Sequence, residues 1–367
     1  MKFVKQEQLK LGMRIAKSIY NDKGVLLYER GTALVPAALQ MLQNGDLFGV
    51  YILDATEPVP PMTDEEIEFE RVQTLQWAEL KKALESIAEG GNFNQVEPLA
   101  NKILDMYSHL KKRITFFQTL RGPSDQYFKH SVNVASLTCM VASRLNIHYK
   151  EIYPIVCAAL VHDVGKLYVD PDILYKPDKL TESELKTVRD AEIRGYNLIR
   201  NNVGISATIR RYITQFYQIS MEKRSGGMFD SSKYLLGTQI LKTMDLFDLM
   251  TSMRIYKKEE SIYRACCYLM DNSQIYPSKI VEALVDSIDV IPSGTCVELQ
   301  SGEKGLVVIE NNRDFRKPTI LSFKDNRMYD LADSKIAEGY YIKDILANFD
   351  NRNKMDLETL ERVQPVS

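Results

Sequence analysis

The chain has 367 residues and a net charge of −2, and 45% of its residues are hydrophobic. This length predicts two or three domains, because one domain usually takes about 100–200 residues. The balance of 47 basic against 49 acidic residues gives no footprint for broad binding of a nucleic-acid polymer, and no apolar run approaches the roughly 18 residues of a membrane span.

Residues 1–55 predict a small β-rich domain. Two short runs, RIAKSIY from Arg14 and GVLLY from Gly24, have the composition of strands, and NDKG between them is typical of a tight turn. A short helix, PAALQMLQNG, follows, and we expect it to stop at Gly45.

Residues 56–124 are interpreted as a linker and a helical pair. After the proline-rich stretch EPVPPM, Thr63 and Glu66 have the spacing of a capping box that starts a long helix, which we expect to end at Gly90. A second helix is predicted over 94–110. The apolar face of the first helix is interpreted as a core face or a homodimer face, and its heptads are too irregular to decide between them.

Residues 125–288 show helical periodicity throughout, with few strand signals, so the fold class is predicted to be mainly α. In residues 289–345 the helical periodicity gives way to a strand pattern. TCVEL and GLVVIE alternate apolar and polar side chains and are joined by SGEKG, which predicts a β-hairpin in a small C-terminal β extension. Residues 346–367 form a polar tail.

Five cysteines occur, an odd number, and none is in a CxxC pair. This pattern predicts reduced thiols in a cytoplasmic protein and gives no spacing for a zinc–cysteine site. The N-terminus lacks the apolar core of a signal peptide, which agrees with a cytoplasmic location. The cysteines are Cys139, Cys157, Cys266, Cys267 and Cys296.

Four side chains of the helical region predict a metal site: His130, His162, Asp163 and Asp245. Each lies in or at the end of an apolar helical pattern, where an ionisable group needs a partner, and one divalent cation supplies a partner to all four. Two imidazoles and two carboxylates suit Fe, Mn, Ni or Zn and leave positions open for water or phosphate oxygens. The alternatives are a His–Asp pair without metal, a core histidine with its own partner, and an aspartate that caps or pairs on a helix.

A metal with an open position lowers the pKa of bound water toward roughly 7 and holds a phosphoryl oxygen, so this ligand set predicts hydrolysis of a phosphate ester. Lys166 follows His162 by four residues. We expect both residues on the same face of one helix, which places the ammonium near the negative charge of the substrate.

The motifs HDVGK, DILYKPDKLTESE and ILKTMDLFDLMTSMRIYK resemble the HD-GYP branch of the HD phosphohydrolase superfamily. The match covers residues 125–288, and His130 in KHSVNVA fits the first histidine of the family. The resemblance implies an HD-type helical bundle between a small N-terminal domain and a C-terminal β extension. It also implies a bacterial enzyme that hydrolyses cyclic di-GMP at a centre of two or three metal ions.

The resemblance further implies roles for individual residues. Asp163 would hold the metal and orient the attacking water, and Lys166 would bind the substrate and stabilise phosphate charge. Arg254 in TSMRIYK matches an arginine of the family pattern, and its role is either structural or substrate-binding.

Several family motifs are incomplete in this chain. The position of a further histidine falls near Ala191, and the position of a His-His pair falls on about Ile219 and Ser220. The Gly-Tyr-Pro signature reads Gly226-Gly227-Met228, without the tyrosine or the proline.

The chain contains four histidines, and His109 and His148 lie outside the matching positions. A full family site needs three histidines beyond His130 and His162, so this chain cannot supply them. Glu192 and Glu222 are the candidate substitutes, and their flanking sequence does not favour either.

We therefore expect one divalent metal per chain. Loss of a two-metal clamp is expected to cost on the order of 10³-fold in rate, because the clamp stabilises both the attacking and the leaving oxygen. Two hypotheses stay open. The chain is a metal-dependent phosphodiesterase for cyclic di-GMP or another phosphate ester, or it is a catalytically inactive regulator that binds a nucleotide or protein partners.

Overall fold

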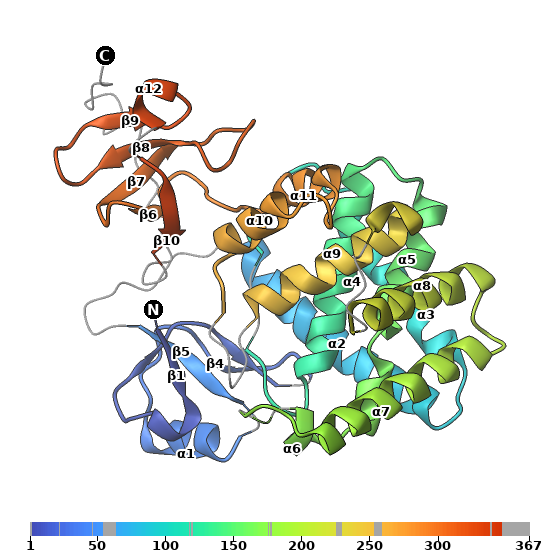
Figure 1. Cartoon of the computed structure of the whole chain (residues 1–367). Coiled ribbons are helices and arrows are strands. Elements are labelled where there is room, and N and C mark those ends of the chain that lie inside the picture. The colour runs from blue at the N-terminus through green and yellow to red at the C-terminus, as the bar shows by residue number, and fades with distance from the viewer. Residues whose placement is uncertain are drawn as a thin grey trace.

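The computed structural model shows a mainly α protein with a small β unit toward each end of the chain, which confirms the predicted fold class. Both β units lie on the same side of the helical body (Figure 1). The structure describes residues 2–21, 23–45, 47–53, 64–116, 118, 120–174, 176, 178–224, 230–252, 259–337 and 340–346.

The N-terminal unit is a three-stranded antiparallel sheet beside a two-stranded hairpin. The sheet has the order β1-β5-β2, and β3 pairs with β4 across the predicted turn, where Asn21 Oδ1 accepts hydrogen bonds from two later amides. The run RIAKSIY is not one strand: β2 joins the sheet and β3 the hairpin. The elements are β1 (Lys2–Lys5), η1 (Gln6–Gln8), β2 (Arg14–Ile15), β3 (Ile19–Tyr20), β4 (Leu26–Tyr28), α1 (Pro36–Gln43) and β5 (Gly49–Leu53).

Two helices, α2 (Asp64–Ala88) and α3 (Val96–Tyr107), follow, with η2 (Phe93–Gln95) between them. The stop of the first helix is confirmed, since Gly90 has φ +90°, a left-handed conformation that glycine adopts at little cost. Thr63 and the side chain of Glu66 lie outside the described residues. The buried faces of both helices belong to the same hydrophobic core as the helices that follow.

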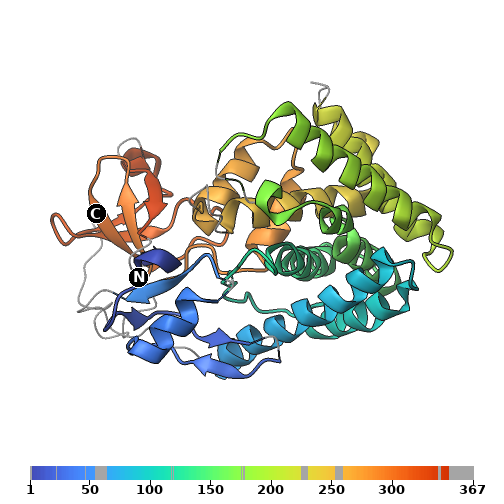
Figure 2. The ribbon, with the colours of Figure 1, turned by 90° about the horizontal axis from the view of Figure 1, so that it is seen from below.

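The rest of the helical body surrounds α4, which packs against α2, α3, α5, α9 and α11 and is seen nearly end-on in Figure 2. This central place explains why α4 is buried along most of its length. The elements are α4 (Gln126–Arg144), α5 (Tyr149–Val161), η3 (Val164–Tyr168), α6 (Pro171–Leu174), α7 (Glu182–Asn201), α8 (Ala207–Arg224), η4 (Ser231–Lys233), α9 (Leu236–Thr251), α10 (Ile262–Asp271) and α11 (Ser278–Val285).

The C-terminal unit is a five-stranded antiparallel sheet of order β10-β6-β7-β8-β9, and the predicted hairpin is confirmed as β6–β7. Its elements are β6 (Cys296–Leu299), β7 (Lys304–Ile309), β8 (Thr319–Ser322), β9 (Met328–Asp330), α12 (Ser334–Ala337) and β10 (Ile342–Ile345). No helix of the described part of the chain is long and apolar enough to cross a membrane. The division of the chain into five segments stays a prediction.

Candidate metal site

The structure brings the four predicted ligands together at the centre of the helical body. His130 comes from α4 and Asp245 from α9, while His162 and Asp163 lie between α5 and η3. The Nε2 atom of His130 lies 3.2 Å from Asp245 Oδ1 and 3.5 Å from Asp163 Oδ2. The Nε2 atom of His162 lies 3.8 Å and 3.6 Å from the same two oxygens.

The helix that carries the apolar run before His162 ends at the HD motif, His162-Asp163, and this corrects the expected position of Lys166. The sequence predicted a single helix through Lys166, but α5 ends at Val161 and Lys166 lies on the separate 3-10 helix η3. Consecutive residues of an α-helix point about 100° apart, so they do not aim at one point. The break after Val161 lets His162 and Asp163 both face the cluster.

The hydrogen bonds of the two histidines leave their inner nitrogens free for a metal. His130 Nδ1 lies 2.6 Å from Asp248 Oδ2 and His162 Nδ1 lies 2.7 Å from the Ala159 carbonyl oxygen. Both partners accept, so Nδ1 carries the proton in the neutral form of each ring, and that form presents a lone pair at Nε2. Within the described part of the chain, both Nε2 atoms are buried without a hydrogen-bond partner.

These donors fit a divalent metal ion. One ligand atom each from His130, His162 and Asp245 lie within 4.8 Å of one another, and Asp163 Oδ2 approaches both imidazoles. Orphaned lone pairs and carboxylate oxygens at one buried point are electrostatically costly unless a cation lies between them. The ligand set of imidazole and carboxylate suits Fe, Mn, Ni or Zn.

Charges around the cluster shift the pKa of several groups. Burial alone would lower the pKa of His130, but the neighbouring carboxylates of Asp245, Asp248 and Asp163 raise it above its ordinary value. Burial opposes ionisation of Asp163 and Asp245, yet the adjacent Lys166 and Lys242 ammonium groups and the imidazoles hold both carboxyl pKa values below their usual range. The carboxylates are thus ionised and ready to bind a cation.

Asp248 is a functional residue that the sequence analysis missed. It is fully buried on α9, holds His130 Nδ1, and accepts two hydrogen bonds from Arg121 at 2.8 and 2.9 Å. Asn133 and Gln118 also donate to it, each at 2.9 Å. Its spacing of three residues after Asp245 puts both carboxylates on one helix face, which was the available signal.

Two lysines neutralise the carboxylate ligands. Lys166 Nζ donates to Asp163 Oδ2, so the predicted phosphate-binding lysine lies at the metal cluster. Lys242 Nζ lies 2.7 Å from Asp245 Oδ2 and 4.5 Å from the centre of the Phe216 ring, and the sequence analysis did not single it out. Positive charge at the cluster favours an anionic substrate.

A pocket opens beside the cluster toward α7 and α8. Its walls include His162, Asp163 and Lys166 on one side and polar and aromatic residues of the two helices on the other. The segment η3 sits against α7 because Gly165 and Gly195 cross closely: a Cβ on Gly165 would meet the Ala191 carbonyl oxygen at 2.7 Å. Glycine at this crossing fixes the HD motif against the pocket wall.

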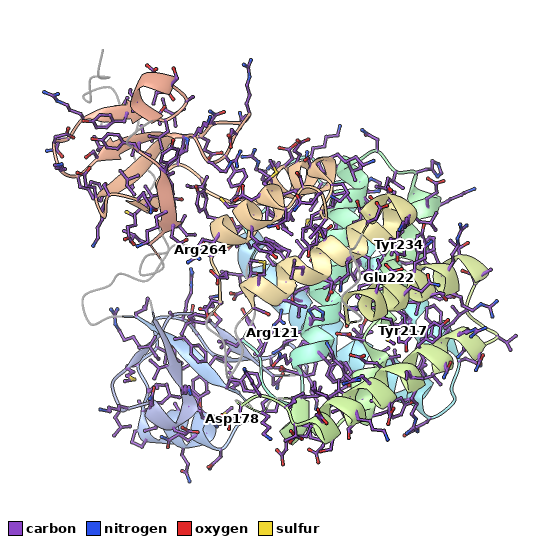
Figure 3. The ribbon with its side chains drawn as sticks, viewed as in Figure 1. Arg121, Asp178, Tyr217, Glu222, Tyr234 and Arg264 are labelled. Carbon is purple, nitrogen blue, oxygen red and sulfur yellow. The ribbon has the colours of Figure 1, made fainter. Side chains whose placement is uncertain are left out.

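The family resemblance places more histidines on α7 and α8, the helices of the far pocket wall. Ser220 lines the pocket, while Ala191 and Ile219 are buried apolar residues that precede the lining residues Glu192 and Ser220 in the chain. Of the two candidate substitutes, Glu192 lines the pocket, whereas Glu222 hydrogen-bonds Tyr234, which it adjoins in Figure 3. Arg254 and the Gly226-Gly227-Met228 segment lie outside the described residues.

Comparison with known proteins places this helical body in a family. Residues 127–272 match the family model described as HD domain. This part of the chain is an HD domain. The match contains all four candidate ligands, from His130 on α4, through His162 and Asp163, to Asp245 on α9.

The HD domain has curated relatives. The chain is 28% identical over 202 residues to a cyclic di-GMP phosphodiesterase of Pseudomonas aeruginosa, covering 54% of this chain and 49% of that protein. It is 31% identical over 147 residues to the 3'3'-cGAMP-specific phosphodiesterase 3 of Vibrio cholerae, covering 39% of this chain and 31% of that protein. The chain therefore spans half or less of the length of these relatives.

One solved structure is also similar. It is an HDG"Y"P protein from Bdellovibrio bacteriovorus, with a TM-score of 0.45 and 16% sequence identity, and the likeness covers 78% of this chain and 98% of that chain.

Proposed function

We propose that this protein is a metal-dependent phosphodiesterase that hydrolyses a cyclic dinucleotide, with cyclic di-GMP as the first candidate substrate. The observation that carries the proposal is the pair of buried, partnerless Nε2 atoms of His130 and His162 facing two carboxylates beside an open pocket. The relatives named as cyclic dinucleotide phosphodiesterases support the substrate class.

The proposed site holds one divalent transition metal through His130, His162, Asp163 and Asp245. When bound, the metal supplies Lewis acidity for a phosphoryl group and a water of lowered pKa. Asp163 orients the attacking water, because its carboxylate is ionised and faces the pocket. Lys166 lies at the pocket wall with its side chain 30% exposed, so it can pair with a phosphate oxygen of the substrate. In the reaction, the water oxygen bonds to phosphorus, the bond from phosphorus to a sugar oxygen breaks, and the proton lost by the water ends on that sugar oxygen.

Two features of the described chain bear on the setting of this activity. The five cysteines are unpaired, which supports the proposed cytoplasmic location because thiols stay reduced there. The family resemblance places the missing histidines near Ala191 and at about Ile219 and Ser220, and the absence of histidine there favours the alternative function. In that alternative, the HD domain binds a nucleotide without turnover and acts through a homodimer or other protein partners.

Hydrolysis of cyclic di-GMP in the presence of Mn²⁺ tests the proposal. We expect measurable turnover by the wild type, a loss on the order of 10³-fold in Asp163→Asn, and a smaller loss, about 10–100-fold, in Lys166→Met. His109→Ala is the matched control, because His109 is an exposed histidine away from the cluster. A wild-type rate equal to that of Asp163→Asn would contradict the phosphodiesterase activity. The catalytically inactive regulator would then be the function that the site supports.

A further inference from the structure

The segment 118–121 joins two parts of the molecule that lie far apart in the sequence. It runs from the helical pair toward α4, at the boundary between the N-terminal unit and the helical body, where Arg121 is labelled in Figure 3. Its described residues are Gln118, Leu120 and Arg121. They make contacts in two directions.

Toward the N-terminal unit, the segment is held by its backbone and by one apolar side chain. Leu120 is 8% exposed and belongs to the hydrophobic core of that unit, not to the core of the helical body. The Phe48 amide donates to the Arg121 carbonyl oxygen at 3.2 Å, and Lys17 Nζ donates to the Gln118 carbonyl oxygen at 3.0 Å. Lys17 is itself placed over the Tyr51 ring of β5, 4.5 Å from its centre.

Toward the helical body, the two polar side chains of the segment hold Asp248. Gln118 Nε2 donates to Asp248 Oδ1 at 2.9 Å, and Arg121 donates to both carboxylate oxygens. Arg121 also donates to Gln118 Oε1 at 2.7 Å, so the two side chains support each other. Asp248 in turn holds His130 Nδ1 at 2.6 Å, which fixes the direction of the Nε2 atom.

We propose that Gln118 and Arg121 are positioning residues for His130. The N-terminal unit sets their position through its hydrogen bonds to the backbone of segment 118–121 and its packing against Leu120. Residues that orient a ligating histidine typically change metal affinity by about 10–100-fold when they are lost. Here the orienting residues lie on a segment whose anchor is the core of another unit. Any event that shifts the N-terminal unit on the helical body therefore changes metal binding at His130.

The proposal rests on the proposed metal site, so its test must separate the two. The probe is Co²⁺ alone, added to the full-length protein, because its visible absorption spectrum reports ligand geometry and its titration gives a dissociation constant. Three variants are compared with the wild type. Leu120→Ala weakens the anchor in the N-terminal core, Lys17→Met removes the bond to Gln118, and Gln118→Ala removes a direct support of Asp248.

The control is Leu299→Ala, which truncates a fully buried leucine of the C-terminal sheet. It makes a comparable cavity outside segment 118–121, so it should lower the melting temperature without changing Co²⁺ binding. We expect Gln118→Ala and Leu120→Ala to raise the Co²⁺ dissociation constant by about tenfold or more and to alter the spectrum. Lys17→Met should raise it about threefold, with recovery in Lys17→Arg, which keeps a donor.

Two results would overturn the proposal, in distinguishable ways. A wild type that binds no Co²⁺ would remove the metal site and, with it, the proposed function. Suppose instead that the wild type binds Co²⁺ and that folded Lys17→Met and Leu120→Ala show the same dissociation constant and spectrum. That result would keep the metal site but contradict the coupling between the N-terminal unit and His130. Lys17 is only partly buried and its substitution truncates no core side chain, so the test does not depend on the folding of Leu120→Ala.

Discussion

The two halves of the candidate site differ sharply in how they are built. Around His130 and His162, every polar atom of the imidazoles except Nε2 has a partner, and Asp248 is itself held by three side chains. On α7 and α8, which supply the other wall of the pocket, Ala191 is 5% and Ile219 is 2% exposed, and both are buried apolar residues.

The two halves therefore differ in what stabilises them: hydrogen bonds to polar side chains in the first half, and apolar packing in the second. A buried histidine whose Nε2 has no partner is costly, and the second layer of hydrogen bonds keeps it in that state. A buried alanine or isoleucine imposes no such cost and contributes packing. The first half is therefore organised to hold an ion, while the second half is organised to close the core.

Asp248→Asn should give the largest effect, because it removes the carboxylate at the centre of the hydrogen bonds that support His130 in the first half of the site. It leaves the Arg121 guanidinium buried without its carboxylate, which costs about 3–5 kcal/mol of stability. Metal affinity should also fall about 10–100-fold. Chemical denaturation and Mn²⁺ titration measure the two effects.

The control for this variant is Asp289→Asn. Asp289 is a carboxylate outside the cluster that accepts a hydrogen bond from Thr115 at 3.0 Å, so its loss should leave Mn²⁺ binding unchanged. If Asp248→Asn binds Mn²⁺ as tightly as the wild type, the second layer of hydrogen bonds does not distinguish the two halves.

Lys242→Met should change the metal affinity of the first half in the opposite direction, toward tighter binding. The Lys242 ammonium lies 2.7 Å from Asp245 Oδ2 and repels a cation bound by that carboxylate. Its removal should raise Mn²⁺ affinity by about tenfold, whereas Lys242→Arg, which keeps the charge, should bind like the wild type. A weaker affinity in Lys242→Met would mean that the lysine serves to hold Asp245 in place.

The pH dependence of the metal-free protein provides a further test of the first half. The carboxylates of Asp245, Asp248 and Asp163 face His130 and raise its pKa in the folded state, against the effect of burial. A raised folded pKa stabilises the protein below the unfolded value of about 6.5, and this stabilisation is lost as the pH rises through the folded value.

A bound cation replaces that proton, so the rise in melting temperature on adding Mn²⁺ should be larger at pH 8 than at pH 6. Thermal melts at both pH values, with and without Mn²⁺, measure it. An equal Mn²⁺ effect at the two pH values would show that His130 does not exchange a proton for the metal.

Glu192→Gln should have the smallest effect, since it probes the half that we expect to bind nothing. Glu192 lines the pocket, and it is the candidate substitute for a missing histidine that remains there. We expect metal content and Mn²⁺ affinity to change less than about twofold. A drop from two metals to one in this variant would show that the second half is also a metal site.

The four ligands were predictable because each is an ionisable residue in an apolar helical pattern, and because HDVGK is a compact motif. Their convergence was not visible in spacing alone: α5 ends at Val161, which aims His162 and Asp163 together, and the next segment, η3, crosses α7 closely at Gly165 and Gly195. That crossing depends on residues about thirty positions apart, so no local pattern reports it.

The supports of His130 were harder to predict. Asp248 shares a helix face with Asp245 and was within reach of a periodicity argument. Gln118 and Arg121 lie in an irregular segment more than a hundred residues before α9, and only the folded chain shows that they meet Asp248. The sheet strands β1 and β5 were missed for a similar reason, since their pairing partners are distant in the sequence.

Metal content per chain tests the central claim most directly. Elemental mass spectrometry of the full-length protein after saturation with Mn²⁺ and removal of free metal should find one ion per wild-type chain, and none in His162→Ala/Asp163→Ala. Two ions per wild-type chain would show that the second half of the pocket also binds metal, and no ion in the wild type would contradict the metal site itself.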